Sequence, residues 1–354
     1  MTTQYEDVTT ETVAGDTEVH EFVMPEEEVI PREKIPVVQQ LTLLAAILLL
    51  LLGGAITPKI IAYFADEVDS VPAAPILREN TDILETSSNT ELIKPFSEVS
   101  IAADAAYVWD VRGQRPLYKK DESTQLPLAS VTKLMTALIA YELLDDTEDV
   151  KVTQQALKQY GNSGLLKDET FDRITLSNLV LMSSSNDGAY ALAAAAGEVL
   201  QKDNGANAFV HAMNIRAEEL GLANTYFKNP TGLDIDETEN GGNGSAKDMA
   251  FLMEYIVENQ PEILFSTRES DARVYSEDGI YHDAVNTNYY IDEIPNVLGS
   301  KTGYTELAGG NLVIAFDAGL DRPIIISVLG STRQERFTDV MELVEQAQAY
   351  VAQQ

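Results

Sequence analysis

The sequence predicts an α+β domain preceded by a single transmembrane helix. Strand-like segments occur near residues 105–118 and again near 311–329, and segments with helical periodicity fill the interval between them. Strands from the two ends of this region are expected to form one sheet, with a mostly helical region in the middle. A long apolar stretch stands ahead of the whole region and predicts the membrane helix.

The first 57 residues predict a tail and a membrane anchor. Residues 1–36 are polar and acidic with few aromatics and no apolar period, which is typical of a disordered tail. Residues 37–57 are almost all apolar, and about 20 helical residues span the roughly 30 Å hydrocarbon core of a bilayer. The leader before them is long and acidic, and no good cleavage site follows, so an uncleaved anchor is expected rather than a signal peptide.

Charges around the predicted anchor indicate its orientation. Arg32 and Lys34 precede the apolar stretch and Lys59 follows it, a small bias that places the N-terminus in the cytoplasm. Residues 58–95 contain scattered Pro, Ser, Thr, Asn and acidic residues with little period, and are interpreted as an extracytoplasmic tether. Residues 96–354 then form the predicted folded domain, outside the cell membrane.

The folded domain is predicted element by element from its periodicity. Two strands and a tight turn open it, a series of helices follows, and a buried hairpin and a last helix close it. The predicted strands are 105–111, 116–118, 311–316 and 323–329, and the predicted helices are 131–144, 153–160, 174–183, 187–200, 206–220, 246–258 and 335–352.

Composition excludes several classes of function. The formal net charge of -33 disfavours nucleic acid as a partner, because the phosphates would be repelled. The chain has no cysteine, so a disulfide framework, a thiolate nucleophile and a cysteine-based zinc site are excluded. None of the three histidines lies near a nucleophile motif, and no Gly-x-Ser-x-Gly segment is present, which argues against a Ser-His-Asp triad.

Ser130-Val131-Thr132-Lys133, at the start of a predicted helix, is the first of three short motifs. Alone, a serine at this place is more often an ordinary helix N-cap. As a nucleophile, Ser130 would feel the positive end of the helix, which favours a developing alkoxide. Lys133 lies three residues on, on the same face, and acts as a base only if burial and a nearby cation lower its pKa from about 10.4. Lys301 is the candidate for that cation.

The second motif, Ser184-Ser185-Asn186, lies between the apolar end of one predicted helix and the start of an alanine-rich one. Alone, it is more often a polar inter-helix loop with a capping residue. In the catalytic interpretation, Ser184 passes a proton to the leaving nitrogen. Asn186 then hydrogen-bonds the substrate backbone and holds Lys133 in place.

Lys301-Thr302-Gly303, followed by Tyr304, is the third motif and is predicted to lie on an edge strand. Alone, it is more often an exposed strand edge with a glycine bulge. In the catalytic interpretation the strand pairs with an extended peptide, Lys301 and Thr302 bind a carboxylate, and Gly303 leaves room for the substrate. The backbone N–H groups of Ser130 and Tyr304 are candidates for an oxyanion hole. The three motifs in this order indicate a serine acyl-transferase that uses no histidine.

The net negative charge of the chain adds one expectation about the site. Because the overall charge repels a carboxylate, the site must be locally positive, and Arg333 or Arg336 are candidates that add to the two motif lysines.

Residues 234–245 superficially suggest a calcium loop, but position 12 is Ser245 rather than Glu and the glycine stands at the wrong offset. An acidic surface loop is expected there, and neither a metal ion nor a cofactor is expected in the site.

Residues 97–340 resemble the low-molecular-mass penicillin-binding proteins, specifically the serine D-alanyl-D-alanine carboxypeptidases. Beyond the motifs themselves, the resemblance rests on the stretches 128–137, 161–165, 229–233 and 301–305. It implies a β-lactamase/transpeptidase-like fold, in which helices flank an antiparallel sheet beside a mostly helical subdomain. It also implies removal of the terminal D-alanine from peptidoglycan stem pentapeptides and acylation by β-lactam antibiotics.

By position, the resemblance makes Ser130 the acylated nucleophile and Lys133 its base, and it carries over Ser184, Asn186, Lys301, Thr302 and Gly303. Residues 96–354 are then a D,D-peptidase catalytic domain held at the bilayer by residues 37–57. A class A β-lactamase is the nearest alternative, although the segment 219–224, which superficially resembles its glutamate-bearing segment, is interpreted as a helix end broken by Gly221. A D,D-endopeptidase on the same scaffold stays open, and a catalytically silent wall-binding protein is less favoured.

Overall fold

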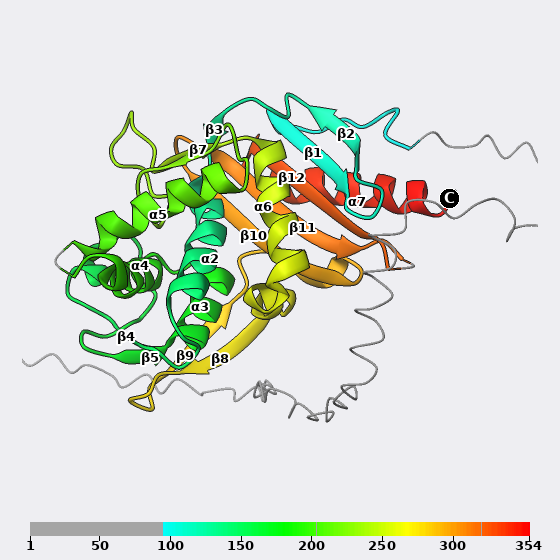
Figure 1. Ribbon diagram of the computed structural model, residues 1–354. Helices are drawn as coiled ribbons and strands as arrows, with labels where there is room; N and C mark the ends of the chain where they lie inside the picture. The colour runs from blue at the N-terminus through cyan, green and yellow to red at the C-terminus, as the bar shows by residue number, and fades with distance from the viewer. Residues whose placement is uncertain (1–94, 203, 320) are drawn as a thin grey trace, which may run out of the picture. The chain divides into compact units, whose positions relative to one another are not determined.

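The computed structural model describes residues 95–354 apart from residues 203 and 320. These residues belong to one compact unit, drawn in Figure 1. The predicted tail and anchor, and all of the predicted tether except Pro95, lie outside the described residues. Within the described part, none of the helices combines the length and the apolar character needed to cross a bilayer.

A five-stranded antiparallel sheet is made from the two ends of the domain, as the sequence predicts. Its strand order is β10-β11-β12-β1-β2. The first strands along the chain pair with the last, with Ala105 opposite Leu329. The bounds are β1 (Ala105–Asp110), β2 (Arg115–Lys120), β10 (Val297–Thr305), β11 (Gly309–Asp317) and β12 (Pro323–Ser331).

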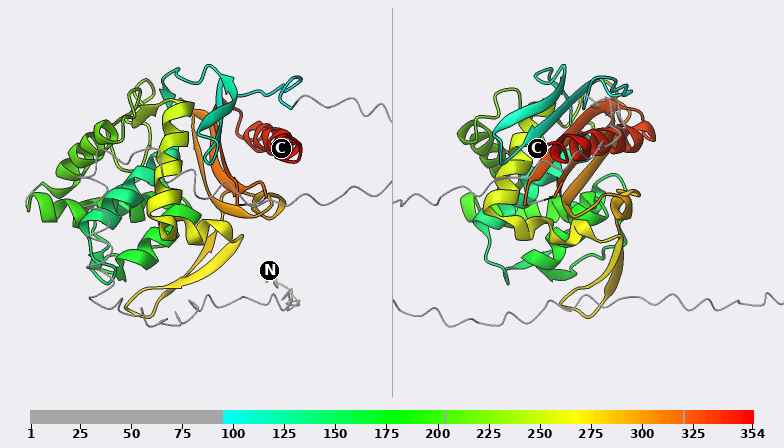
Figure 2. Two further views of the ribbon diagram at one scale, coloured as in Figure 1. Left: turned by 45° about the vertical axis from the view of Figure 1, so that its right-hand side comes forward. Right: turned by 90° about the vertical axis from the view of Figure 1, so that its right-hand side faces the viewer.

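Helices cover both faces of this sheet (Figure 2). Successive side chains of a strand point to opposite faces, and along β1 the residues alternate accordingly between two separate hydrophobic clusters. One cluster holds Val108 and the buried stripe of α7 (Glu335–Val351). The other holds Trp109 and the buried stripe of α6 (Ala246–Asn259), and continues into the helical subdomain.

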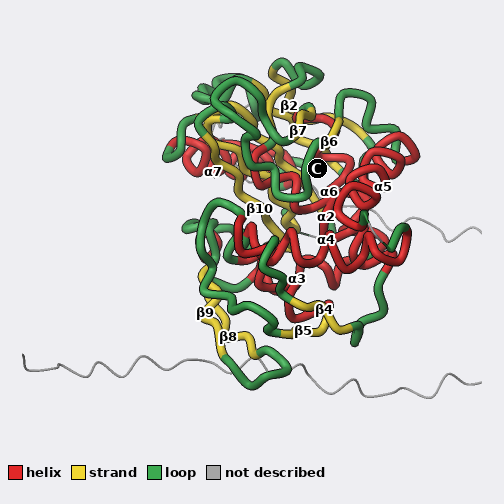
Figure 3. Tube along the Cα trace, turned by 90° about the vertical axis from the view of Figure 1, so that its left-hand side faces the viewer, coloured by secondary structure: helices red, strands yellow, loops and turns green. Residues whose placement is uncertain are grey.

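The helical subdomain surrounds one central helix (Figure 3). This helix, α2 (Lys133–Leu143), is buried without interruption from Lys133 to Ala140 and follows a 3-10 turn, η2 (Ala129–Thr132). The first motif therefore spans the turn and the start of this helix, with Ser130 in η2 and Lys133 at the first position of α2. The surrounding helices are α3 (Arg173–Met182), α4 (Asn186–Leu200) and α5 (Gly205–Glu219).

Two of the predicted helices differ from the structure by more than a residue at one end. The predicted helix 153–160 is wrong, because only Ala156–Lys158 form a short 3-10 turn, η3. Val152 instead exchanges backbone hydrogen bonds with the 168–169 segment, the turn ends at Gln159 with an extended backbone, and Gly161 follows with a φ of +92°. The predicted helix 131–144 begins as the 3-10 turn η2, so Ser130 lies inside a tight turn rather than at a helix N-cap.

The short strands were not predicted, because each has too few residues to show a period. The most prominent is a hairpin in which Tyr275 pairs with Tyr281. The short strands and 3-10 turns that complete the domain are β3 (Leu126–Pro127), β4 (Asp149–Lys151), β5 (Thr170–Asp172), β6 (Tyr226–Phe227), β7 (Gly242–Gly244), η4 (Pro261–Arg268), β8 (Asp271–Tyr275), β9 (Tyr281–Val285) and η5 (Ile291–Glu293).

Candidate active site

Ser130 lies in a turn that two neighbouring segments approach very closely. A Cβ atom added to Gly232, which has a φ of +76°, would stand 1.8 Å from the carbonyl oxygen of Ala129. A Cβ atom added to Gly303 on β10 would stand 2.8 Å from the carbonyl oxygen of Leu128 and 3.1 Å from the backbone nitrogen of Ser130. The turn is therefore clamped between two glycines. The sequence interpretation assigns the space beside Gly303 to the substrate. In the structure, the turn that carries Ser130 occupies that space.

Lys133 is completely buried, and its amine has three oxygen partners. The Nζ atom lies 2.7 Å from Ser130 Oγ, 2.7 Å from Asn186 Oδ1 and 2.9 Å from the carbonyl oxygen of Thr231. A neutral amine has two protons and one lone pair. The amide and carbonyl oxygens accept the two protons, which leaves the lone pair to accept the proton of the Ser130 hydroxyl. This is the hydrogen-bond arrangement that a general base requires.

The surroundings of Lys133 favour its neutral form. Burial is the largest cause that lowers its pKa well below the ordinary value, and the positive charge of Lys301 adds to it, whereas Asp187 acts in the opposite direction. Burial also lowers the pKa of Lys301 to about 7, with a further contribution from the charge of Arg336. Burial and a neighbouring positive charge therefore lower the pKa of both amines.

Ser184 is placed by the junction between α3 and α4. Ser183 ends α3, and Ser185 is buried and caps α4 by accepting a hydrogen bond from the backbone N–H of Gly188 at 2.9 Å. Between them Ser184 adopts a left-handed φ of +61°, a strained conformation for a residue with a side chain. Its hydroxyl accepts a hydrogen bond from Lys301 Nζ at 3.0 Å, so the second and third motifs meet there.

The third motif lies on β10, the free edge of the sheet on this side, as the sequence predicts. Lys301 is only 1% exposed, and its amine also donates to the carbonyl oxygen of Thr302 at 3.0 Å. The hydroxyl of Thr302 lies 2.6 Å from that of Thr287. Lys301 is therefore enclosed beside Ser184, whereas Thr302, itself only 4% exposed, is among the residues that line the neighbouring cavity.

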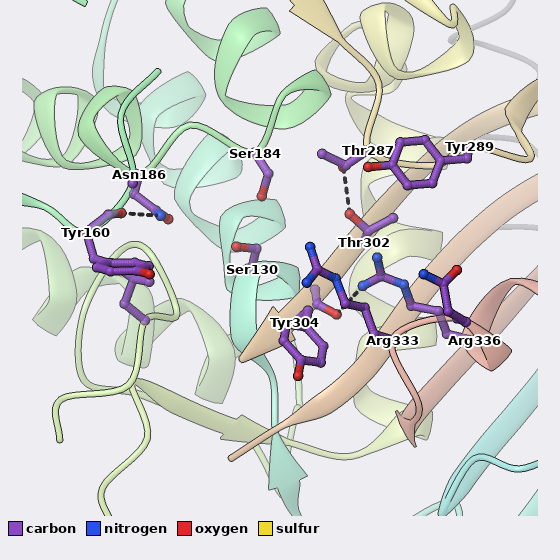
Figure 4. A pocket seen from close by; sticks show the side chains of 14 residues that line it. Ser130, Tyr160, Ser184, Asn186, Thr287, Tyr289, Thr302, Tyr304, Arg333 and Arg336 are labelled. Carbon is purple, nitrogen blue, oxygen red and sulfur yellow. Dashed lines mark hydrogen bonds between the residues drawn. The ribbon is translucent and has the colours of Figure 1, made fainter. Parts of the chain in front are cut away.

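A cavity of about 410 Å³ joins the three motifs, with Ser130, Ser184, Asn186, Thr302, Gly303 and Tyr304 among its lining residues. That volume is within the range of small-ligand sites. Figure 4 shows Tyr160 and Asn186 at one end and Arg333 and Arg336 at the other, with Ser130 between them. The cavity therefore has a cationic end and a neutral end, and the hydroxyl of Ser130 faces it between the two.

Arg336 at the cationic end is the most constrained of these side chains. It is 6% exposed, its Nη1 donates to the carbonyl oxygen of Gly303 at 2.6 Å, and its Nε has no partner among the described residues. Burial lowers its pKa to about 10, with a further contribution from Arg333. A guanidinium with unused donors beside a cavity is suited to a planar anion such as a carboxylate. Sequence reasoning offered Arg336 only as one of two alternatives.

The carbonyl group of Thr231 is a functional contact that sequence reasoning did not assign. The side-chain oxygen of Asn229 accepts hydrogen bonds from the backbone N–H and hydroxyl of Thr231 and from the N–H of Gly232, at 3.1, 2.9 and 2.8 Å. This turn aims the Thr231 carbonyl at Lys133. The stretch 229–233 belongs to the family resemblance, but a backbone carbonyl group leaves no signal in the sequence of side chains. Thr287, Tyr289 and Tyr160 were missed because they stand alone in ordinary loops.

The acidic segment 234–245 is tied into the protein by its own hydrogen bonds. Asp234 accepts from the hydroxyl of Thr305 at 3.0 Å and from the backbone N–H of Leu307 at 3.3 Å. Asp236 accepts from the backbone N–H groups of Thr238 and Glu239, which lowers its pKa. In the described part of the chain no three histidine or carboxylate side chains cluster closely enough to hold a metal ion.

The fold and the site together define a class of protein: a serine enzyme of the acyl-transfer type in which a buried lysine stands in the place of a base. Comparison with known proteins identifies the family. Residues 91–333 match the family model of the D-alanyl-D-alanine carboxypeptidases, peptidase family S11. Because the match covers more than half of the chain, the chain belongs to this family.

Relatives with known names agree with this assignment. D-alanyl-D-alanine carboxypeptidase DacF of Bacillus subtilis is 32% identical over 71% of this chain, and the chain spans 64% of the length of that relative. A D-alanyl-D-alanine endopeptidase of Escherichia coli is 29% identical, covering 69% of this chain and 74% of that protein. The structure of penicillin-binding protein D2 from Listeria monocytogenes in its ampicillin-bound form matches with a TM-score of 0.60 and 26% identity, covering 70% and 98% of the two chains.

Proposed function

We propose that the protein is a serine D-alanyl-D-alanine carboxypeptidase that removes the terminal D-alanine from peptidoglycan stem pentapeptides through an acyl-enzyme, and that it is acylated by penicillins. The observation that carries the proposal is the buried Lys133 amine, 2.7 Å from Ser130 Oγ and held by two further acceptors. The endopeptidase name of one relative supports the same chemistry on a cross-linked substrate.

Acylation begins with attack of Ser130 Oγ on the carbonyl carbon between the two D-alanine residues. Lys133 takes the hydroxyl proton, and the carbonyl oxygen becomes an oxyanion that the backbone N–H groups of Ser130 and Tyr304 bind. The C–N bond then breaks as a proton passes through Ser184 to the leaving nitrogen. The products are free D-alanine and an ester on Ser130, which water hydrolyses to release the shortened peptide and restore the hydroxyl.

Substrate orientation follows from the two ends of the cavity. The terminal carboxylate binds at the cationic end, where Thr302, Arg336 and the charge of Lys301 stand. Asn186 binds the backbone of the acyl portion, which leads toward Tyr160 at the neutral end. A ligand placed in this way lays the scissile bond over Ser130.

Mass spectrometry of the full-length protein tests the proposal. A pentapeptide that ends in two D-alanines is expected to lose one D-alanine, and a penicillin is expected to leave a stoichiometric, long-lived covalent adduct on the protein. Rapid turnover of the penicillin with no action on the peptide would favour a β-lactamase. If the folded protein neither removes D-alanine from the peptide nor forms an adduct with the penicillin, only a wall-binding role would remain.

Endopeptidase action is a second candidate function, favoured by the relative of that name. A cross-linked substrate must carry a second peptide past the cationic end of the cavity, on the side of the leaving nitrogen. Release of monomeric stems from a purified cross-linked dimer, measured beside D-alanine release from the pentapeptide, gives the ratio of the two activities.

Replacement of Arg336 by methionine is expected to raise the KM of a D-Ala-D-Ala peptide about 10- to 100-fold, because a charged hydrogen bond to the terminal carboxylate is lost. The preference for the free acid over the C-terminal amide should fall by the same factor. Arg333→Met is the control, because Arg333 is exposed and stacks over Tyr304. Its effect should stay below about 3-fold in KM, within the range for an exposed charge. An unchanged preference in Arg336→Met would remove this arginine from the carboxylate site.

Replacement of Lys301 by glutamine is expected to shift the acidic limb of the acylation profile to higher pH. The charge of Lys301 lowers the pKa of Lys133, so its removal raises that pKa and reduces the neutral fraction of the base at any acidic pH. The measurement is the second-order rate constant of labelling by a fluorescent penicillin between pH 4 and 9. Lys119→Gln, at an exposed position on β2, should leave the limb in place. A limb that stays or moves to lower pH in Lys301→Gln would contradict the coupling of the two amines.

We also propose that the enzyme works outside the cell, held by a single membrane helix over residues 37–57 with the tail at residues 1–36 in the cytoplasm. The apolar composition of the stretch and the basic residues that precede it support this arrangement. Protease added to intact cells should digest the catalytic domain and leave an epitope tag on residue 1 protected. The opposite pattern would reverse the orientation, and recovery in the soluble fraction would remove the anchor.

A further inference from the structure

A pair of hydroxyl groups stands at the cationic end of the catalytic cavity, one from a motif and one from outside it. The side-chain oxygen atoms of Thr287 and Thr302 lie 2.6 Å apart, and both residues line the cavity (Figure 4). Thr302 belongs to the third motif on β10, whereas Thr287 lies in the loop that follows β9. Among the described residues, Thr287 is the one hydrogen-bond partner of the Thr302 hydroxyl. The orientation of each hydroxyl therefore depends on the other.

The direction of this hydrogen bond decides what the Thr302 hydroxyl offers to a ligand. A hydroxyl has one hydrogen to donate and two lone pairs. If Thr302 donates to Thr287, its hydrogen is used, and it offers a carboxylate only lone pairs, which repel it. If Thr287 donates to Thr302, the hydrogen of Thr302 is left for the carboxylate, and the two successive hydrogen bonds strengthen each other. A bound terminal carboxylate therefore favours the second direction.

The neighbours of the Thr287 hydroxyl favour the same direction. The second oxygen within its reach is the carbonyl oxygen of Met182, the last residue of α3, at 3.5 Å. That distance is longer than the usual range of about 2.5–3.0 Å for a hydrogen bond between two oxygens. The hydroxyl of Thr302, at 2.6 Å, is therefore the better acceptor of the Thr287 hydrogen.

The backbone of Thr287 is held from two sides. Its N–H group donates to the carbonyl oxygen of Met182 at 3.1 Å. The side chain of the preceding residue, Asn286, is buried and donates to the carbonyl oxygens of Thr267 and Glu269 at 3.0 and 2.8 Å. The partner hydroxyl is carried by β10, which is paired along its length with β11. Both oxygens are therefore fixed before a ligand binds, as preorganised hydrogen bonding requires.

We propose that Thr287 is a positioning residue of the carboxylate site: it donates its hydroxyl hydrogen to Thr302 and thereby directs the Thr302 hydrogen at the terminal carboxylate of the substrate. The inference rests on the proposed carboxypeptidase function and specifies how the free acid end of its substrate is recognised. Thr287 acts through Thr302 and makes no contact of its own with the carboxylate. Its effect therefore falls on the binding of a free acid and not on the chemistry at Ser130.

Variants of Thr287 test the inference on the full-length protein, with a pentapeptide that ends in D-Ala-D-Ala as the free acid or as the C-terminal amide. Thr287→Val removes the hydroxyl at nearly constant shape. It is expected to raise the KM of the free acid about 5-fold with kcat unchanged, the usual contribution of one neutral hydrogen bond. The preference for the free acid over the amide should fall about 3-fold or more, because a charged acceptor forms the stronger hydrogen bond.

Thr287→Ser is the conservative variant, and because it keeps the hydroxyl it should keep the preference for the free acid. If Thr287→Val does not fold, Thr287→Ala also lacks the hydroxyl and takes its place. Thr124→Val, at an exposed position outside the cavity lining, should leave the preference as in the wild type. A preference that is unchanged in Thr287→Val, or lost equally in Thr287→Ser, would overturn the inference.

A double-mutant cycle with Thr302→Val separates an indirect role of Thr287 from a direct one. If Thr287 acts through Thr302, Thr287→Val should change the KM of the free acid by less than about 2-fold in a protein that already carries Thr302→Val. A further increase of about 5-fold there would show that Thr287 contacts the carboxylate itself or only supports the fold, and the inference would be wrong. Failure of the proposed function is distinct from this, since the wild type would then release D-alanine from neither peptide.

Discussion

The Ser130→Ala variant is expected to lose covalent labelling by penicillin completely and to lose about 10⁴-fold or more in D-alanine release. No other hydroxyl stands 2.7 Å from the amine of Lys133 in the described part of the chain. Removing a catalytic nucleophile in serine hydrolases abolishes nearly all of the chemistry and leaves only the contribution of binding and the oxyanion hole. The measurements are gel fluorescence with a labelled penicillin and release of D-alanine from the pentapeptide.

Ser123→Ala is the matched control for this variant. Ser123 lies in the same loop region ahead of Ser130 but is exposed, so labelling should be unchanged. The thermal unfolding temperature of Ser130→Ala should stay close to that of the wild type, because the serine hydroxyl is only one of the contacts of Lys133. A folded Ser130→Ala protein that still takes up one penicillin per chain would show that another residue is the nucleophile.

Replacement of Lys133 by methionine should slow acylation by about 10³-fold, within the usual contribution of a general base. Methionine has a similar shape and fills the buried position without a charge. Exchange of a buried ionisable group for an apolar one of like volume is often neutral or stabilising, so the fold is expected to persist. The second-order labelling rate separates this variant from the wild type, and circular dichroism during heating reports its stability.

Lys133→Arg provides the sharper comparison. An arginine keeps the positive charge and can donate to Asn186 and to the carbonyl oxygen of Thr231, but it does not lose its proton in the working pH range. If Lys133 acts as a base, both variants are expected to be slowed to a similar degree, about 10³-fold. Substantial labelling in Lys133→Arg would mean that the lysine serves as a fixed cation and that another residue acts as the general base.

The sequence predicts the main sheet and the large helices well, because they carry long, regular patterns. The helix 174–183 and the last helix, 335–352, are each found within one residue of their predicted bounds. The prediction of helix 153–160 is wrong for the opposite reason. A few apolar residues in a loop imitate a helical period, but the left-handed φ of Gly161 and the backbone pairing of Val152 are incompatible with a helix. Ser130 lies in a 3-10 turn because Ala129 takes a left-handed φ of +47°, which no periodicity reveals.

The site is predicted wherever a side chain belongs to a motif and is missed wherever tertiary packing alone supplies the contact. The structure brings Ser130, Lys133 and Asn186 into one hydrogen-bonded group and Ser184 and Lys301 into a second, at the same cavity. The sequence does not reveal that Lys301 is fully buried and donates to Ser184. Nor does it reveal that Gly303 is small for the sake of a neighbouring turn, because both facts depend on segments more than 100 residues away.

The pairing of β1 with β12 has a consequence for when the enzyme becomes active. β12 lies between β1 and β11, so β10 and its lysine are joined to the first strands only after residues 323–331 are in place. Contacts so distant along the chain form late, since a long loop must close first. A partly synthesised chain therefore already contains the first two motifs, but its β10 is not joined through the sheet to β1 until residues 323–331 have been made. The third motif is therefore brought to the first two only when the last strand of the sheet is complete.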